Sequence, residues 1–381
     1  MSISLIQRLI NQENLDGWAL YDFHHTNDLM WELLKFPRDA HVTRRVFYWI
    51  PREGKPVKVV HAIEKNALDF LEGDSLVYRT QDELKEVLRK TLGKKIAMEV
   101  SSEIPVISKV DAGTFTMLQG LGIEIISSGK LLQRFTSVLS EEQIKAHLEA
   151  ADVVSKTADK AFEFVRGELL QGKLLYEGDV QEFILNRFTD TGCITDHSPI
   201  VARGANSANP HYMPKGRGAP IKRGDFLLID LWCKRRGEHG VYGDITRVAC
   251  TEKPTDKQQA AFEVVREAQR MAVEMIEMNE TVRGCDVDRL VREYLEERGY
   301  KDNILHRLGH NITGQLHGNG ANLDSFETMD ERELIDNTCY SVEPALYFPG
   351  EFGLRLEFDI LYRNGKVQVT GGVQDSLTVL V

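Results

Sequence analysis

Phe226-Leu-Leu-Ile-Asp230-Leu-Trp232 opens the stretch that decides the fold, and Val241-Tyr-Gly-Asp244-Ile-Thr-Arg-Val-Ala249 closes it. Between these runs lies Arg236-Gly-Glu-His-Gly240. Two runs of strand-forming residues around a glycine-containing turn predict an antiparallel β-hairpin. Each predicted strand carries one aspartate among apolar residues. Pairing these two aspartates directly across the hairpin centres its turn on Gly237 and places both carboxylates on one face.

A second predicted hairpin repeats the spacing. Tyr340-Ser-Val-Glu343-Pro-Ala-Leu-Tyr347 and Leu354-Arg-Leu-Glu357-Phe-Asp-Ile-Leu-Tyr362 flank a turn that the same pairing centres on Gly350. The two acids of each hairpin are 14 residues apart in sequence. A single carboxylate in a chain with 58 acidic residues is ordinarily a solvated surface group. Opposed carboxylates inside apolar strands are costly without a cation between them, so the pairs are predicted to bind metal.

His310 completes the predicted ligand set of Asp230, Asp244, Glu343 and Glu357. Four carboxylates and one imidazole suit a pair of divalent ions such as Mn, Co, Fe or Zn. Two such ions about 3.5–4 Å apart can hold a bridging hydroxide and polarise a carbonyl group. The sequence therefore predicts a metallohydrolase.

Length and composition set the general class of protein. A chain of 381 residues exceeds the size that one hydrophobic core usually serves, so two domains are expected. The net charge of −11, without a long basic run, argues against a nucleic-acid partner. Five cysteines without CxxC spacing argue against a disulfide scaffold or a thiolate zinc site. No signal-peptide core or long apolar stretch is present, so we expect a cytoplasmic protein without a membrane partner.

Residues 1–136 are predicted to form an α/β domain without a catalytic constellation of its own. Helices are expected over residues 80–92 and 112–121. The expected strands are Trp18–Tyr21, Val46–Ile50, Val57–Val60, Lys95–Met98 and Ile123–Ile126.

Residues 137–381 contain an internal repeat. Amphipathic helices are expected to begin after Ser140 and Thr255, each with features of a capping box. A second helix follows each of them, over residues 178–192 and 285–299, and a carboxylate-bearing hairpin comes next. Helix, helix and hairpin occur twice, which predicts a pseudo-twofold α/β unit whose halves supply one central site.

The motifs of this second region resemble those of a known superfamily. They are Gly204-Ala-Asn-Ser-Ala-Asn-Pro-His211, Leu228-Leu-Ile-Asp230, Gly243-Asp-Ile-Thr-Arg247, Gly309-His310 followed by His317, Val342-Glu-Pro344 and Leu354-Arg-Leu-Glu357. Residues 137–381 resemble the pita-bread fold of the creatinase, aminopeptidase P, prolidase and methionine aminopeptidase superfamily, peptidase family M24. Residues 1–136 resemble the creatinase-type N-terminal domain.

The resemblance implies that the five predicted ligands bind two metal ions, with Mn the first choice. All five are present, which argues against the metal-free creatinase branch. It also implies that Glu343 shuttles protons and that His211 and His317 contact the substrate and the tetrahedral intermediate. His306 matches a position near the proline subsite, and Tyr347 and Arg355 match supporting positions.

The implied activity is hydrolysis of the Xaa-Pro bond of dipeptides or peptide N-termini, by a homodimer. Two alternatives stay open: a non-peptide amidase of the same fold, and a metal-free binding protein. Departures from the family pattern adjoin the site. They are Trp232 after Asp230, Ala345 after Glu343-Pro344, Phe358 after Glu357, and Gly-Asn-Gly after His317. The first hairpin is also about three residues longer than usual in the family.

Overall fold

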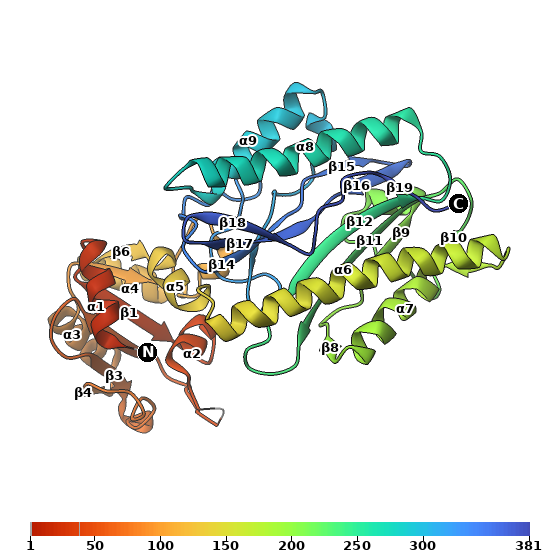
Figure 1. Ribbon diagram of the computed structural model, residues 1–381. Coiled ribbons are helices and arrows are strands. Elements are labelled where there is room, and N and C mark those ends of the chain that lie inside the picture. The colour runs from red at the N-terminus through yellow and green to blue at the C-terminus, as the bar shows by residue number, and fades with distance from the viewer. Residues whose placement is uncertain (1, 38) are drawn as a thin grey trace. The chain divides into compact units, whose positions relative to one another are not determined.

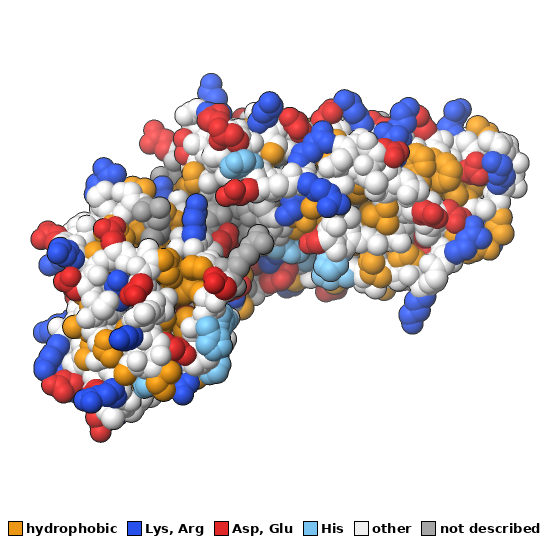
Figure 2. Space-filling model, turned by 90° about the horizontal axis from the view of Figure 1, so that it is seen from below, with side chains coloured by type: hydrophobic (Ala, Val, Ile, Leu, Met, Phe, Trp, Pro, Cys, Tyr) orange, Lys and Arg blue, Asp and Glu red, His pale blue; other side chains and the backbone are white. Residues whose placement is uncertain are grey.

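The computed structural model describes residues 2–37 and 39–381. The chain divides into two compact units, residues 1–136 and 137–381, and each is described by itself. Among the described residues, no helix is both long enough and apolar enough to cross a membrane. On the face drawn in Figure 2, acidic and basic side chains are interspersed.

The first unit is built on a six-stranded sheet with the strand order β4-β3-β2-β1-β5-β6. Strand β2 is antiparallel to both of its neighbours, β1 and β3, and the pairs β3-β4, β1-β5 and β5-β6 are parallel. The strands are β1 (Gly17–Asp22), β2 (Val46–Pro51), β3 (Val57–His61), β4 (Asp74–Tyr78), β5 (Lys95–Met98) and β6 (Glu124–Ser127). The helices are α1 (Ile3–Gln12), α2 (Asp28–Leu34), α3 (Gln81–Thr91), α4 (Ala112–Gly120) and α5 (Gly129–Thr136), with short 3₁₀ turns η1 (Ala62–Glu64) and η2 (Pro105–Ile107).

The central strand β1 is buried on both faces of the sheet, and its successive side chains point to opposite sides. On β1, Trp18 and Leu20 pack with residues of α1, α2 and α5, whereas Ala19 and Tyr21 pack with residues of α3 and α4. The two predicted helices and five predicted strands are present. Strand β4 was not predicted, because four of its five residues are exposed and lack an apolar alternation.

The second unit contains two pairs of helices. They are α6 (Glu141–Leu170) with α7 (Glu177–Asp190), and α8 (Asp256–Met278) with α9 (Gly284–Glu297). Ser140 and Thr255 begin the long helices with full capping boxes, in which the third helical residue is Gln143 or Gln258. A capping box satisfies two backbone N–H groups that a helix start leaves unpaired. The two predicted capping boxes are confirmed.

The strands of the second unit lie between these helix pairs (Figure 1). One sheet has the order β19-β12-β11-β8, with β9 also paired to β11, and the other has the order β13-β14-β17-β18. Two small two-stranded ladders, β15-β16 and β10-β7, complete the second unit. The strands are β7 (Leu175–Tyr176), β8 (Cys193–Ile194), β9 (Ile200–Arg203), β10 (Pro220–Ile221), β11 (Phe226–Arg235), β12 (Gly243–Cys250), β13 (Asn311–Ile312), β14 (Thr338–Val342), β15 (Ala345–Phe348), β16 (Phe352–Arg355), β17 (Phe358–Arg363), β18 (Lys366–Thr370) and β19 (Thr378–Val379), with 3₁₀ turns η3 (Gly204–Ala208) and η4 (Lys301–Asn303).

The alternation along β11 decides where its aspartate points. Leu227 and Ile229 pack into a cluster with residues of α6 and α7, whereas Phe226 and Leu228 pack into a cluster with residues of α8 and α9. Asp230 has the parity of the second set and therefore faces the interior shared with the second half of the unit.

Candidate metal centre and active site

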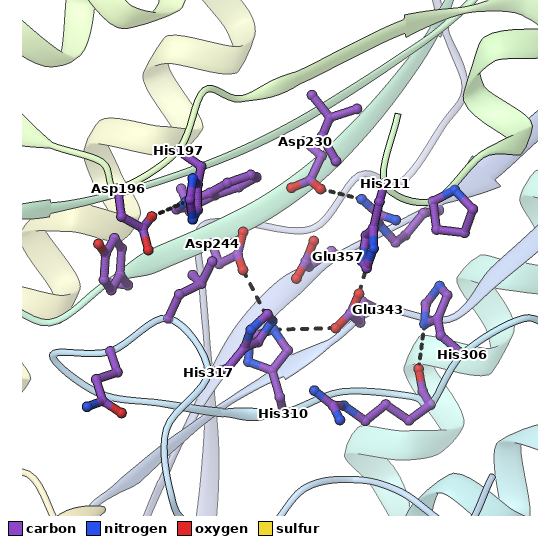
Figure 3. A pocket seen from close by; sticks show the side chains of 18 of the residues that line it. Asp196, His197, His211, Asp230, Asp244, His306, His310, His317, Glu343 and Glu357 are labelled. Carbon is purple, nitrogen blue, oxygen red and sulfur yellow. Dashed lines mark hydrogen bonds and ion pairs between the residues drawn. The ribbon is translucent and has the colours of Figure 1, made fainter. Parts of the chain in front are cut away.

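The predicted site residues converge on one cavity of about 1080 Å³. Nine of the ten line it: Asp230, Asp244, Glu343, Glu357, His310, His211, His317, His306 and Arg355. Figure 3 shows the labelled histidines and carboxylates turned toward a common space. The tenth, Tyr347, is buried, with 1% of its surface exposed. Segments more than 100 residues apart in sequence therefore supply a single site.

The first hairpin differs from its predicted register. Asp230 lies opposite Thr246, and Asp244 lies opposite Trp232, so the turn is centred one residue after Gly237. Gly237 has a φ of +120° and its carbonyl accepts a hydrogen bond from Gly240, so it begins the turn instead of bisecting it. The direct pairing of the two aspartates is wrong by two residues. An even displacement preserves the face, so both carboxylates still point into the cavity.

The second pair of acids sits at a break between two ladders. Val342 pairs with Phe358 in one ladder, and Ala345 pairs with Arg355 in the other. Both ladders are centred on Gly350, so Glu343 and Glu357 lie opposite each other between them. The two long strands predicted here are each split in two. Pro344 has no N–H group to donate, which accounts for the interruption beside Glu343.

Backbone groups at the break bond to other segments. The N–H group of Glu343 donates to the carbonyl of Leu308 at 2.8 Å. That of Glu357 donates to the carbonyl of Thr246 at 3.2 Å, and the hydroxyl of Thr246 donates to Oε2 of Glu357 at 2.6 Å. The interruption thus turns the second pair toward the first hairpin and anchors it there.

His310 approaches the carboxylates just before β13. Its N–H group donates to Oγ of Ser341 at 3.0 Å, and its carbonyl accepts from the N–H group of Ser341 at 2.9 Å. The preceding Gly309 makes this approach possible, because a Cβ there would lie 2.0 Å from the carbonyl oxygen of Ser341. Nε2 of His310 ends 3.5 Å from Oε1 of Glu343 and 3.8 Å from Oδ2 of Asp244.

The electrostatics of this cluster favour a bound cation. Burial raises the pKa of Asp244 and of Glu357 well above the ordinary range, and the neighbouring carboxylates raise both further. Burial also raises the pKa of Glu343 to about 7. Oδ1 of Asp244 is buried without a hydrogen-bond partner among the described residues. Ligand atoms of Asp244, His310 and Glu357 lie within 4.8 Å of one another.

These residues fit divalent metal ions by their chemistry. A cation removes the repulsion between the carboxylates and gives the unpartnered oxygen of Asp244 a contact. Nδ1 of His310 is 3.4 Å from the carbonyl of Asn311, so Nε2 is the nitrogen left to face the carboxylates. The set is mostly oxygen with one imidazole, which matches ions of the Mn, Fe, Co and Zn series.

Arg355 connects Asp230 to the rest of the site. Its guanidinium donates to Oδ2 of Asp230, to the hydroxyl of Tyr347 at 2.9 Å and to Oγ1 of Thr246 at 3.0 Å. The hydroxyl of Tyr347 lies 2.8 Å from Nε2 of His306. Because Nδ1 of His306 faces the carbonyl oxygen of the next residue at 2.7 Å, Nδ1 carries the proton and Nε2 accepts from Tyr347.

The remaining histidines occupy the open side of the cavity. The ring of His317 packs edge-on against that of His310, with their centroids 4.3 Å apart. Burial lowers the pKa of His317 and lowers that of His306 to about 3, so both imidazoles are neutral near pH 7. His211 is exposed and lies on the loop that follows η3.

Glu177 holds the loop of His211 in place. Its two carboxylate oxygens accept from the N–H groups of Arg203 at 2.9 Å and Ala219 at 2.7 Å. They also accept from the side chains of Asn206 at 2.8 Å and Tyr212 at 2.7 Å. Four bonds from one buried side chain fix both ends of the segment. Sequence reasoning missed this residue, because its contacts reach up to 42 residues along the chain.

Sequence reasoning also missed several residues near the predicted metal ligands. Oδ2 of Asp359 accepts a hydrogen bond from the backbone N–H of Asp244 at 2.8 Å. The sequence could have indicated this residue by its position two residues after Glu357, on the same face of the predicted strand. Trp232, noted only as a departure, donates from Nε1 to Oδ1 of Asp196 at 2.9 Å. Lys234, Arg307 and Glu327 also line the cavity.

A family model supplies the decisive comparison. The model of metallopeptidase family M24 matches residues 145–364. The chain belongs to this family. Xaa-Pro dipeptidases are among the curated relatives. That of Pyrococcus furiosus is 29% identical over 249 residues, covering 64% of this chain and 68% of the relative. That of Lactobacillus helveticus is 28% identical over 231 residues, covering 59% of this chain and 57% of the relative.

Solved structures of a prolidase and of an X-Pro aminopeptidase share the architecture over nearly the whole chain. A prolidase from Thermococcus sibiricus matches with a TM-score of 0.63 at 20% identity, covering 99% of this chain and 98% of that one. An X-Pro aminopeptidase from Thermotoga maritima matches with a TM-score of 0.59 at 21% identity, covering 97% and 99%. The predicted pita-bread fold preceded by an N-terminal domain is confirmed.

Proposed function

We propose that this M24 metallopeptidase hydrolyses the Xaa-Pro bond of dipeptides or of peptide N-termini. The observation that carries the proposal is the convergence of four carboxylates and His310 beside three further histidines in one cavity. The relatives named Xaa-Pro dipeptidase support the substrate class. In this proposal residues 1–136 are a creatinase-type N-terminal domain and residues 137–381 are the catalytic domain.

The proposed cofactor is a pair of divalent ions, with Mn first and Co, Zn or Fe as alternatives. Asp230, Asp244, His310, Glu343 and Glu357 would hold them. When bound, such ions supply Lewis acidity that polarises the scissile carbonyl and lowers the pKa of water. Arg355 orients Asp230, and Asp359 orients the backbone of Asp244. Partners of this kind fix metal ligands and tune affinity.

Glu343 is the proposed proton carrier. Its side chain is 14% exposed, whereas those of Asp230 and Asp244 are 9% and 6% exposed, so Glu343 has the best access to substrate and water of these three acids. A carboxylate with such access can accept a proton from water and return it to a leaving group. We assign it the transfer of a proton from the attacking water to the leaving nitrogen.

The histidines are proposed to bind the substrate. His317 and His211 line the cavity and would donate hydrogen bonds to the substrate carbonyl and to the negative charge that develops on it. His306, held by Tyr347 and linked through it to Arg355, would border the proline ring. The amide before a proline has no N–H group, so the site would select it by shape.

The test is a panel of Xaa-Pro dipeptides, Xaa-Pro-Xaa tripeptides and matched Xaa-Ala peptides, assayed with Mn or Co. We expect the Xaa-Pro peptides to be cleaved and the Xaa-Ala peptides to be cleaved far more slowly. Equal rates for the two series would contradict the proline assignment. No cleavage by protein that holds two ions would favour the alternative, a non-peptide amidase.

We further propose a homodimer in the cytoplasm. The first unit contributes no residue to the described cavity, which fits a role in assembly. All five cysteines are free thiols, as is usual in a reducing compartment. Light scattering at micromolar concentration should give about twice the chain mass of 43.3 kDa. A mass of one chain would contradict the dimer.

A further inference from the structure

Three cationic side chains line the described part of the cavity, and two of them are held by contacts with the cavity wall. Nζ of Lys234 donates to the carbonyl of Gly314 and lies 4.6 Å from the centroid of the Tyr242 ring. The guanidinium of Arg355 donates to Asp230 and to two hydroxyl groups, as described above. These two cations therefore stabilise the walls of the cavity and have few donors left for a ligand.

The third cation, Arg307, is different. Its guanidinium donates no hydrogen bond to any residue that the structure describes. Its ion pair, from Nη1 to Oε2 of Glu327, measures 3.9 Å and is too long for a hydrogen bond. The other oxygen of Glu327 accepts the backbone N–H of Arg307 at 3.0 Å. A guanidinium carries five N–H donors, so those of Arg307 are left for a ligand.

Arg307 is also close to the proposed catalytic groups. It lies between His306 and His310 in sequence, and it lines the cavity with 23% of its side chain exposed. Glu343 and His317 line the same cavity, so one small substrate can contact the guanidinium together with these groups.

The balance of charge around the cavity favours an anionic ligand. Six carboxylates and three cations among the described residues line it, a formal charge of −3. Two divalent ions, bound as proposed above, would change this to +1. The cavity would then no longer repel a negatively charged substrate. The planar guanidinium of Arg307 can donate two parallel hydrogen bonds to a carboxylate.

We propose that Arg307 binds a carboxylate of the substrate and thereby makes the enzyme prefer acidic peptides. This inference rests on the proposed peptidase function. The carboxylate has two possible sources in a short peptide. One is the free α-carboxylate of an Xaa-Pro dipeptide, and the other is the side chain of an acidic residue next to the scissile bond.

The experiment compares peptides that differ only in charge. Ala-Pro against Ala-Pro amide tests the α-carboxylate, and Asp-Pro amide against Asn-Pro amide, or Ala-Pro-Asp amide against Ala-Pro-Asn amide, tests an acidic side chain. Each is assayed with the wild type, Arg307→Gln and Arg307→Lys. We expect Arg307→Gln to raise KM about 10- to 100-fold for the preferred acidic peptide, with little change in kcat and little change for the neutral amide. Arg307→Lys should restore part of the loss, because it keeps the charge without the fork.

Glu327→Gln is the matched control. If Arg307 only pairs with Glu327 to hold the loop, the two glutamine variants should impair acidic and neutral peptides alike, and the proposal is overturned. If Arg307 binds substrate, Glu327→Gln should keep or strengthen the preference for acidic peptides. Circular dichroism and thermal melting establish that each variant is folded.

A binding measurement separates this proposal from the proposed function. Calorimetry with L-proline, N-acetylaspartate amide and L-prolinamide needs no turnover. Weaker binding of an acidic probe to Arg307→Gln, with prolinamide unchanged, supports the carboxylate site even if no Xaa-Pro peptide is cleaved. Cleavage of Xaa-Pro peptides together with equal binding of every probe to wild type and variant would overturn the carboxylate site and leave the peptidase assignment standing.

Discussion

The two carboxylate pairs have the same spacing in sequence but different geometry. Asp230 and Asp244 belong to a continuous ladder and are displaced by two residues from each other. Glu343 and Glu357 stand opposite each other at a break between two ladders. An even spacing determines that two residues share a face of a hairpin, but the turn and the ladder determine how they meet.

The difference also gives the two pairs different supports. The first hairpin is stabilised by its own strand pairing. The second pair is also anchored by the bonds between Glu357 and Thr246, and Asp359 of the second hairpin in turn accepts the backbone N–H of Asp244 in the first. The two hairpins therefore form one unit, and a change in either is expected to affect the metal site as a whole.

The largest effect is expected from Glu343→Gln. The variant keeps the shape of the side chain and removes the proposed proton carrier from the break. Turnover should fall by a factor of about 10² to 10⁴, the usual range for loss of acid–base catalysis, while the fold is retained. His306→Ala should reduce turnover less, because the role proposed for His306 is to border the substrate and not to transfer a proton. Near-normal turnover of Glu343→Gln, measured with saturating metal, would refute the role.

Asp359→Ala tests whether the second hairpin supports the first. The change leaves the buried N–H of Asp244 without its acceptor at 2.8 Å. Metal affinity should fall about 10- to 100-fold, as is typical when a partner of a metal ligand is lost. Asp359→Asn retains an acceptor oxygen and should lose less. Calorimetric titration with Mn measures the metal affinity of both variants. Equal affinity of the wild type and Asp359→Ala would show that the hairpins are independent.

His147 on α6 joins the two halves from behind the site. Its Nδ1 donates to the carbonyl of Tyr242 at 2.7 Å, and its Nε2 accepts from Thr370 at 2.8 Å. Burial lowers the pKa of His147 from 6.5 to about 4. The unfolded chain therefore binds a proton between these pH values that the native chain does not, and the free energy of unfolding falls as pH falls from 6.5 toward 4.

The size of this effect follows from the shift. Between about pH 7 and pH 5 the one histidine should lower the free energy of unfolding by about 2 kcal/mol. Urea unfolding at the two pH values measures it, and His147→Gln is the control because it removes the titrating group. An unchanged pH dependence in that variant would contradict the neutral, bridging histidine.

Local signals in the sequence were enough for much of the fold. The capping residues Ser140 and Thr255 and the repeated spacing located the helix pairs and the four acids. The register of the first hairpin was misplaced, because Gly237 marks the start of the turn and alternation alone does not distinguish shifts of two residues. The break at Pro344 was missed because apolar residues continue on both sides of it.

The supports of the site were beyond reach for a different reason. Asp359 contacts a residue 115 positions away, and Glu177 contacts residues 26 to 42 positions away. No periodicity or motif spacing encodes such contacts. They arise when separate elements pack together, as do the positions of Lys234 and Arg307 in the cavity wall.

We propose that the two differently built pairs of acids hold one metal site. Elemental analysis of protein reconstituted with Mn or Co and freed of excess ions tests it most directly, with the wild type beside the double variant Asp244→Ala/Glu357→Ala, which removes one acid from each pair. We predict about two ions per chain for the wild type and a large loss for the folded double variant. An unchanged metal content in the double variant would contradict the account.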